Sequence, residues 1–217
     1  MKRTKKILVT LLCAVLLVTG TVAVTVAYLT DSASVQNTFT FGQVGISLDE
    51  AKVNTDGTVI SGEGAGRGVG NVYHLIPGHE YTKDPIVHVD EGSEDCWLFV
   101  KLKNDLKPII AATTIEAQMQ ANGWTCIDAT NNIWAYKEIV SASANVSVFG
   151  KFKLTNDADV SQYATTTDGE GKVTGGKTID VTAYAVQADG FNVDEKSAEE
   201  NAVAAWTAAF GATTTTQ

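Results

Sequence analysis

The N-terminal segment constrains this chain most, because it joins the features of an export signal to a strand-forming sequence. Four basic residues precede an uncharged run of 20 residues, 7–26. Thr25 and Ala27 then place small side chains at the −3 and −1 positions of a cleavage site. A basic tip, an apolar run and small residues before a cut are what the secretion machinery reads. We therefore predict a signal peptide over residues 1–27, cleaved between Ala27 and Tyr28.

An uncleaved membrane anchor is the alternative interpretation, since an apolar run of this length approaches that of a membrane span. Four threonines and a glycine lower the hydrophobicity of the run, and a cleavage-like site ends it, which favours the cleaved signal. We expect the mature protein to be secreted, either into an extracellular matrix or onto the cell surface. It would then meet the membrane only during export.

The mature chain is strongly acidic. Residues 1–27 contain four of the 16 Lys+Arg and none of the 25 Asp+Glu, so their removal leaves a net charge of −13. Binding to nucleic acid depends on clustered basic side chains that neutralise phosphates, so we expect no nucleic acid partner. Only three prolines and 19 glycines, with no long charged helix, indicate a β-rich globular class.

An alternating segment follows the predicted cut. Side chains of period two mark a half-buried strand, and a glycine that interrupts the alternation suggests a bend. Here Gly42 separates two such stretches, so we predict an extension over residues 28–41 that can act as a donor strand. The apolar and polar residues of the assembly strand are Tyr28, Val35, Asn37, Phe39 and Phe41 before the glycine, and Val44, Ile46 and Leu48 after it.

The remaining chain predicts a single β-rich domain over residues 42–211 and a polar tail over 212–217. Its fold class is mainly β, a jelly-roll-like antiparallel two-sheet sandwich with one or two peripheral helices. Capping-box sequences predict short helices at 114–122 and from Ser197 onwards. Polar, glycine-rich loops are expected at 54–71 and 164–177. Strands are expected at 86–90, 96–103, 124–128, 133–140, 146–154 and 178–187.

Two cysteines remain after cleavage, Cys96 and Cys126. In an exported protein such a pair can form a disulfide, and chain-entropy reasoning gives a bridge of this loop length about 3–4 kcal/mol. The alternative is two buried free thiols, which behave as small hydrophobic side chains. The sequence leaves both open.

Three histidines, His74, His79 and His88, lie close together among several carboxylates. A divalent metal site is conceivable there, but the spacing matches no ligand motif, and ordinary solvent-facing loop residues are the favoured interpretation. In particular, no second histidine stands four residues after His79 to complete a zinc-protease helix. No catalytic motif is present, so we expect neither an enzyme nor a cofactor.

Two stretches resemble the TasA/camelysin family of Gram-positive exported proteins. One is the junction Val26–Asp31 with the strand segment after it, where the family has an Ala-[Tyr/Phe]-x-[Thr/Asn]-Asp pattern cut by a dedicated SipW-type signal peptidase. The other is Leu75–His79 with Lys83–Val89, which is similar to the family's Pro-Gly … Lys-Asp-Pro strand start. The resemblance covers residues 7–50 and about 72–103.

The resemblance implies a jelly-roll-like fold and assembly into extracellular biofilm fibres, in which the N-terminal strand of one subunit completes a sheet of the next. The implied partners are further copies of this chain, a related minor subunit and the dedicated signal peptidase. An added strand gains main-chain hydrogen bonds and covers an exposed sheet edge, which fits the alternating segment found here. The alternatives are a cell-surface metal-dependent protease of camelysin type and a monomeric adhesin or carbohydrate-binding module.

Overall fold

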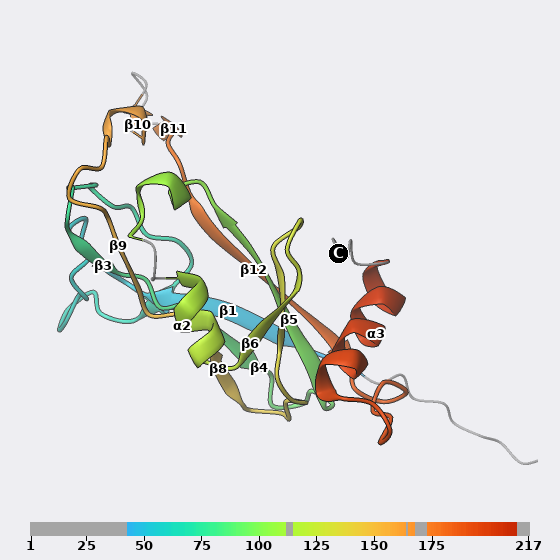
Figure 1. Ribbon diagram of the computed structural model, residues 1–217. Coiled ribbons are helices and arrows are strands. Elements are labelled where there is room, and N and C mark those ends of the chain that lie inside the picture. The colour runs from blue at the N-terminus through green and yellow to red at the C-terminus, as the bar shows by residue number, and fades with distance from the viewer. Residues whose placement is uncertain (1–42, 112–114, 164, 168–172, 212–217) are drawn as a thin grey trace, which may run out of the picture. The chain divides into compact units, whose positions relative to one another are not determined.

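The computed structural model describes residues 43–211 except 112–114, 164 and 168–172 (Figure 1). The chain divides into two units, Met1–Phe41 and Gly42–Gln217, and every described residue belongs to the second. The predicted signal peptide, the extension 28–41 and the tail 212–217 therefore lie outside the described residues. Within the described ranges, no helix is both long and apolar enough to cross a membrane.

The described residues form a mainly β, antiparallel fold that includes two four-stranded sheets and two α-helices, as the sequence predicted. The first sheet has the strand order β2-β1-β4-β8 and the second β12-β5-β7-β6. The strands of the first sheet are β1 (Ile46–Ala51), β2 (Arg67–Gly68), β4 (Ile86–Val89) and β8 (Asn145–Ser147). Those of the second are β5 (Cys96–Asn104), β6 (Trp124–Asp128), β7 (Ile133–Tyr136) and β12 (Ile179–Gln187).

Strand β5 lies inside the second sheet, and its two faces serve two separate cores. Leu98 and Val100 point into the main core between the sheets, while Trp97 and Phe99 point to the outer face of the sheet. This explains why the strand begins with an unbroken apolar run. Towards its end the outer face carries the exposed Lys101, so the strand becomes amphipathic, as predicted.

Helix α3 (Ala198–Phe210) covers the outer face of the second sheet as a third layer (Figure 1). Its start is fixed by the predicted capping box: the Ser197 hydroxyl accepts from the Glu200 N–H at 3.2 Å, and the Glu200 carboxylate accepts from the Ser197 N–H at 2.8 Å. Trp206 then anchors the helix, with its ring centroid 5.1 Å from that of Phe99. Burying one helical face against the sheet is what stabilises a helix this short.

Helix α2 (Ile115–Ala121) closes part of the main core with two fully buried side chains, Ile115 and Met119. It ends at Gly123, whose φ of +92° is accessible to glycine without a Cβ penalty. The predicted helix is therefore confirmed, and its expected capping residues at 113 and 114 lie outside the described ranges.

The hairpin predicted around residues 129–132 is confirmed as β6 and β7, but β7 is shorter than expected. It ends at Tyr136, and Val140 instead makes an isolated bridge to Cys96, with both N–H···O distances 2.9 Å. After Tyr136 the chain leaves the sheet, and at Val140 it returns to pair with Cys96, the first residue of β5.

The single strand predicted over 146–154 is wrong. Strand β8 pairs with β4, whereas β9 (Lys151–Lys153) pairs with β3 (Glu80–Thr82), so the segment leaves one sheet for another. Val148 and Phe149 are both completely buried between the two strands, and consecutive buried residues cannot belong to one half-buried strand. The alternation of apolar and polar residues continues from β8 into β9 because the buried side chains of both strands enter the main core.

The segment 164–177 is also more regular than the predicted loop. It contains the antiparallel pair β10 (Thr165–Thr167) and β11 (Val173–Gly175). Two single-turn 3-10 helices, η1 (Lys107–Ile109) and η2 (Ser161–Tyr163), complete the elements of the described part.

Candidate functional site

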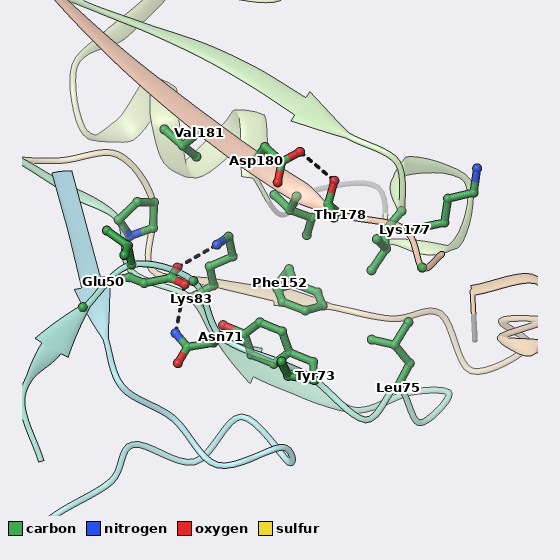
Figure 2. A pocket seen from close by; sticks show the side chains of 18 of the residues that line it. Glu50, Asn71, Tyr73, Leu75, Lys83, Phe152, Lys177, Thr178, Asp180 and Val181 are labelled. Carbon is green, nitrogen blue, oxygen red and sulfur yellow. Dashed lines mark hydrogen bonds and ion pairs between the residues drawn. The ribbon is translucent and has the colours of Figure 1, made fainter. Parts of the chain in front are cut away.

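A cleft of about 450 Å³ opens between the two sheets, where the end of β1 and the start of β12 line it together (Figure 2). Three segments contribute most of its walls: Leu48–Glu50 from β1, the loop from Gly68 to Tyr73, and Lys177–Val181 leading into β12. Phe152 and Leu106 lie at its base, against the main core. The cleft is therefore a side opening of the sandwich itself.

The interior of the cleft is mostly apolar and rigidly packed. The ring of Tyr73 meets Phe152 edge-on with centroids 5.4 Å apart, and Phe152 stacks on Tyr81 at 5.0 Å. The Tyr73 hydroxyl donates to the Thr82 carbonyl oxygen at 2.9 Å. Burial raises the pKa of the Tyr73 phenol, and the nearby Glu50 carboxylate raises it further, so this side chain stays a neutral donor.

The polar end of the cleft is built around Glu50. Its Oε2 accepts from Lys83 Nζ at 2.6 Å, and its Oε1 accepts from Asn71 Nδ2 at 2.9 Å. Figure 2 shows the lysine and the asparagine reaching the same carboxylate from different segments. Glu50 is buried although it is charged, which requires partners of this kind.

Arg67 fixes the loop beside the cleft. Its guanidinium donates to the Asp49 carboxylate, to Asp84 Oδ2 at 2.9 Å and to the Asp84 carbonyl oxygen at 2.8 Å. Strand β2 is only two residues long and pairs with β1 through only two residue pairs. The side-chain contacts of Arg67 therefore help to hold this segment in place. Val69 and Val72 follow in the same loop and line the cleft, where they are 87% and 67% exposed.

Strand β12 offers a nine-residue edge next to the cleft. On one side it pairs with β5 along its whole length, and within the described ranges no strand pairs with its other side. Which groups face that open side follows from the ladder. Asp105 N–H donates to the Thr178 carbonyl oxygen and Ala188 N–H to the Asp95 carbonyl oxygen. The even-numbered residues of β12 therefore bond to β5, and the odd-numbered residues, from Ile179 to Gln187, direct their N–H and C=O groups to the open edge.

The three histidines do not form the metal site considered from the sequence. His88 lies on β4, with Nε2 2.9 Å from Asp49 Oδ1 and Nδ1 against the Asn145 amide oxygen. His79 Nε2 lies 2.8 Å from the Asp56 carbonyl oxygen. The His74 main chain donates its N–H to the Thr55 carbonyl oxygen at 2.7 Å and accepts from the Tyr81 hydroxyl at 2.8 Å. Among the described residues no three His, Cys, Asp or Glu side chains converge on a point that could hold a metal ion.

The disulfide considered from the sequence is also corrected: Cys96 and Cys126 are free thiols. Cys126 pairs with Trp134 and Trp134 with Val100, so the two cysteines lie two strands apart and four residues out of register. At strand spacings near 4.8 Å and rises near 3.4 Å per residue, the two cysteines are about 17 Å apart, far beyond disulfide reach. Burial raises the pKa of the Cys96 thiol to about 11, which leaves it unreactive at neutral pH.

The predicted assembly strand is divided by the structure. Val44, Ile46 and Leu48 pack against the chain's own main core, and Ile46 and Leu48 pair with Val89 and Val87 of β4. They belong to the domain and are not available for exchange. The cleavage site and the other members of the set lie outside the described residues, namely Ala27, Tyr28, Val35, Asn37, Phe39 and Phe41.

The Glu50, Lys83 and Asn71 constellation was not among the residues singled out from the sequence. Glu50 is 21 positions from Asn71 and 33 from Lys83, and the three belong to no recognised motif. The only local signal was a glutamate in an otherwise apolar alternation, a position that predicts a buried and therefore partnered charge.

No family model, characterised protein or solved structure matches this chain.

Proposed function

We propose that this chain is a secreted, non-enzymatic structural subunit of the TasA/camelysin type. It forms extracellular matrix fibres of the kind found in biofilms, by adding residues 28–41 of one copy to the open edge of β12 in the next. Homopolymerisation is the primary interaction, with a related minor subunit as a second partner. The N-terminal strand becomes available once the dedicated signal peptidase cuts after Ala27.

The observation that carries this proposal is the open edge of β12 beside an apolar cleft. A long unpaired edge is a template for strand addition, and soluble proteins normally protect such an edge. Its outward-facing groups supply main-chain hydrogen bonds, while the cleft can take apolar side chains at every second position of an incoming strand.

The occupant follows from the pattern of the extension. Phe39 and Phe41 share one face of a strand and Thr38 and Thr40 the other, so one face is suited to the cleft and the other to solvent. The extension precedes Gly42, where the chain divides into its two units. It is therefore continuous in sequence with the domain while belonging to the other unit.

The test compares the chain beginning at Tyr28 with the same chain lacking residues 28–41, by electron microscopy and sedimentation. The longer form is expected to make filaments, and the shorter form is expected to remain a monomer. Filaments of unchanged yield from the shorter form would contradict the proposal. A monomer that binds polysaccharide would instead indicate the adhesin.

A matched pair of variants separates strand addition from any general effect of the extension. Replacing Phe39 and Phe41 by lysine removes the apolar face and is expected to abolish filaments. Replacing Thr38 and Thr40 by lysine adds the same charge to the opposite face and is expected to leave filaments largely intact. If both variants lost filaments to the same extent, the added charge would control assembly, and the apolar face of Phe39 and Phe41 would not.

A further inference from the structure

Inside the cleft, Glu50 holds a primary amine and a carboxamide on the two oxygens of one carboxylate. Lys83 Nζ donates to Oε2 at 2.6 Å, and Asn71 Nδ2 donates to Oε1 at 2.9 Å (Figure 2). The side chains of Lys83 and Glu50 are only 11% and 7% exposed. The amine of Lys83, the amide of Asn71 and the carboxylate of Glu50 are thus in contact, and the carboxylate and the amine are largely buried.

The amide of Asn71 is fixed in an orientation suited to reaction. Its Oδ1 accepts from the Val53 N–H at 3.1 Å, and its Nδ2 donates to both Glu50 and the Ala51 carbonyl oxygen. The carbonyl oxygen therefore points at a main-chain donor, and the nitrogen points at the carboxylate. A donor placed on an oxygen that becomes negative is the arrangement of an oxyanion hole.

Stability alone gives a weak account of this arrangement. A buried ion pair gains little over well-packed apolar residues, because both charges lose their hydration. Leu48, Tyr73 and Phe152 are among the residues that line the cleft with them, so apolar replacements would have apolar neighbours there. A lysine and an asparagine held on one buried carboxylate are, in contrast, what acyl transfer between them requires.

We propose that Lys83 and Asn71 join in an intramolecular isopeptide bond, formed by the protein itself with Glu50 as the catalytic acid and base. The product is a secondary amide between Nζ and Cγ, and the other product is ammonia, released as ammonium. The bond does not depend on polymerisation and would form in a single folded copy of the chain.

The steps balance without any co-reactant. Glu50 Oε2 takes a proton from the Lys83 ammonium, and the freed lone pair on Nζ attacks Cγ of Asn71. The carbonyl electrons move onto Oδ1, where the Val53 N–H stabilises them. Glu50 gives its proton to Nδ2, the Cγ–Nδ2 bond breaks as the carbonyl re-forms, and ammonia leaves. The second proton of Nζ passes through Glu50 to the ammonia, which restores the carboxylate.

Folding supplies the positioning that this reaction needs. Amines do not attack unactivated amides at a useful rate in water, but two groups held on one carboxylate react at a very high effective concentration. The reaction is thus expected only in the folded chain.

The bond would tie the rim of the cleft to the body of the domain. Asn71 belongs to the loop beside β1, and Lys83 lies between β3 and β4, so the bond closes a ring that contains β3. The two cysteines are too far apart to brace this fold. An isopeptide bond would brace the domain whatever the redox state outside the cell.

The test is the intact mass of the purified full chain, compared with the mass calculated for its determined N-terminus. We expect a mass lower by one ammonia, and a tandem mass spectrum in which the peptides of Lys83 and Asn71 are joined. Glu50→Gln and Lys83→Arg are expected to show the full calculated mass. Lys103→Arg, a matched change at an exposed lysine, is expected to keep the loss of ammonia.

The full calculated mass in the folded wild-type chain, with Lys83 and Asn71 in separate peptides, would overturn the proposal. So would a loss of ammonia that persists in Lys83→Arg, since that would identify a succinimide at Asn71. Bond formation in Glu50→Gln would remove Glu50 as the catalyst. If Glu50→Gln fails to fold, the wild-type peptide map and Lys83→Arg still decide the outcome.

Discussion

Replacing Ala183 by proline is expected to weaken strand addition to β12 while leaving the pairing of β12 with β5 in place. Ala183 is odd-numbered, so its N–H faces the open edge, and the ladder to β5 loses no hydrogen bond. Proline is tolerated in sheets at edge positions whose N–H faces outwards. The neighbouring change Thr182→Pro is the matched control, because the Thr182 N–H belongs to the pair with Lys101.

The magnitudes follow from one hydrogen bond in each case. Ala183→Pro removes one donor to an added strand, worth about 0.5–1.5 kcal/mol, which raises the critical concentration for assembly by roughly 2- to 10-fold before any clash with the proline ring. Thr182→Pro leaves the Lys101 carbonyl unpaired in the middle of the sheet. It is therefore expected to be less stable than Ala183→Pro by about 1–3 kcal/mol.

Two measurements check this pair. Urea unfolding followed by tryptophan fluorescence gives the stabilities, and sedimentation over a concentration series gives the critical concentrations. Equal stabilities for the two variants would refute the assignment of inward and outward residues on β12. Assembly of Ala183→Pro at the wild-type critical concentration would refute the use of this edge in assembly.

Two further predictions concern pH and backbone conformation. The hydrogen bond that His88 donates to the Asp49 carboxylate raises the pKa of His88, so His88 stabilises the fold below its ordinary pKa of 6.5, and this contribution fades as pH rises through the raised value. The difference between the urea midpoints of wild type and His88→Gln should thus shrink as pH rises above about 6.5, and a difference that grows with pH would contradict the sign. Gly57→Ala places a Cβ 2.8 Å from Tyr81 Cα at a φ of +82° and should cost about 3 kcal/mol in urea unfolding. Gly62→Ala has a similar φ but open space and should cost about 1 kcal/mol, so equal losses would show that the contact is unimportant.

Much of the β architecture could be predicted from local pattern. The unbroken apolar start of β5, the turn that joins β6 and β7, and the capping box at Ser197 each act over a few residues. Side-chain periodicity and capping depend on neighbours in the sequence, so these signals survive without knowledge of the fold. The prediction failed between Val148 and Gly150, where the same alternation crosses from one sheet to another.

The candidate site depends on contacts that no local pattern contains. Asn71, Lys83 and Glu50 come from three segments, and only the pairing of β1 with β2 and β4 in one sheet brings the lysine and the asparagine to one buried carboxylate. The open edge of β12 is likewise a property of strand order, because the same nine residues between two partners would carry no exposed edge.

The sequence by itself determined that this chain is β-rich and where helix α3 begins, and it predicts an export signal followed by an alternating segment at the N-terminus. These follow from hydrophobic periodicity, capping chemistry and charge, which act locally along the chain. Tertiary structure alone decided that Ile46 and Leu48 belong to the domain, that Cys96 and Cys126 stay apart, and that a lysine and an asparagine share Glu50. Those outcomes depend on register and on which sheet each strand joins, and residues distant in the sequence set both.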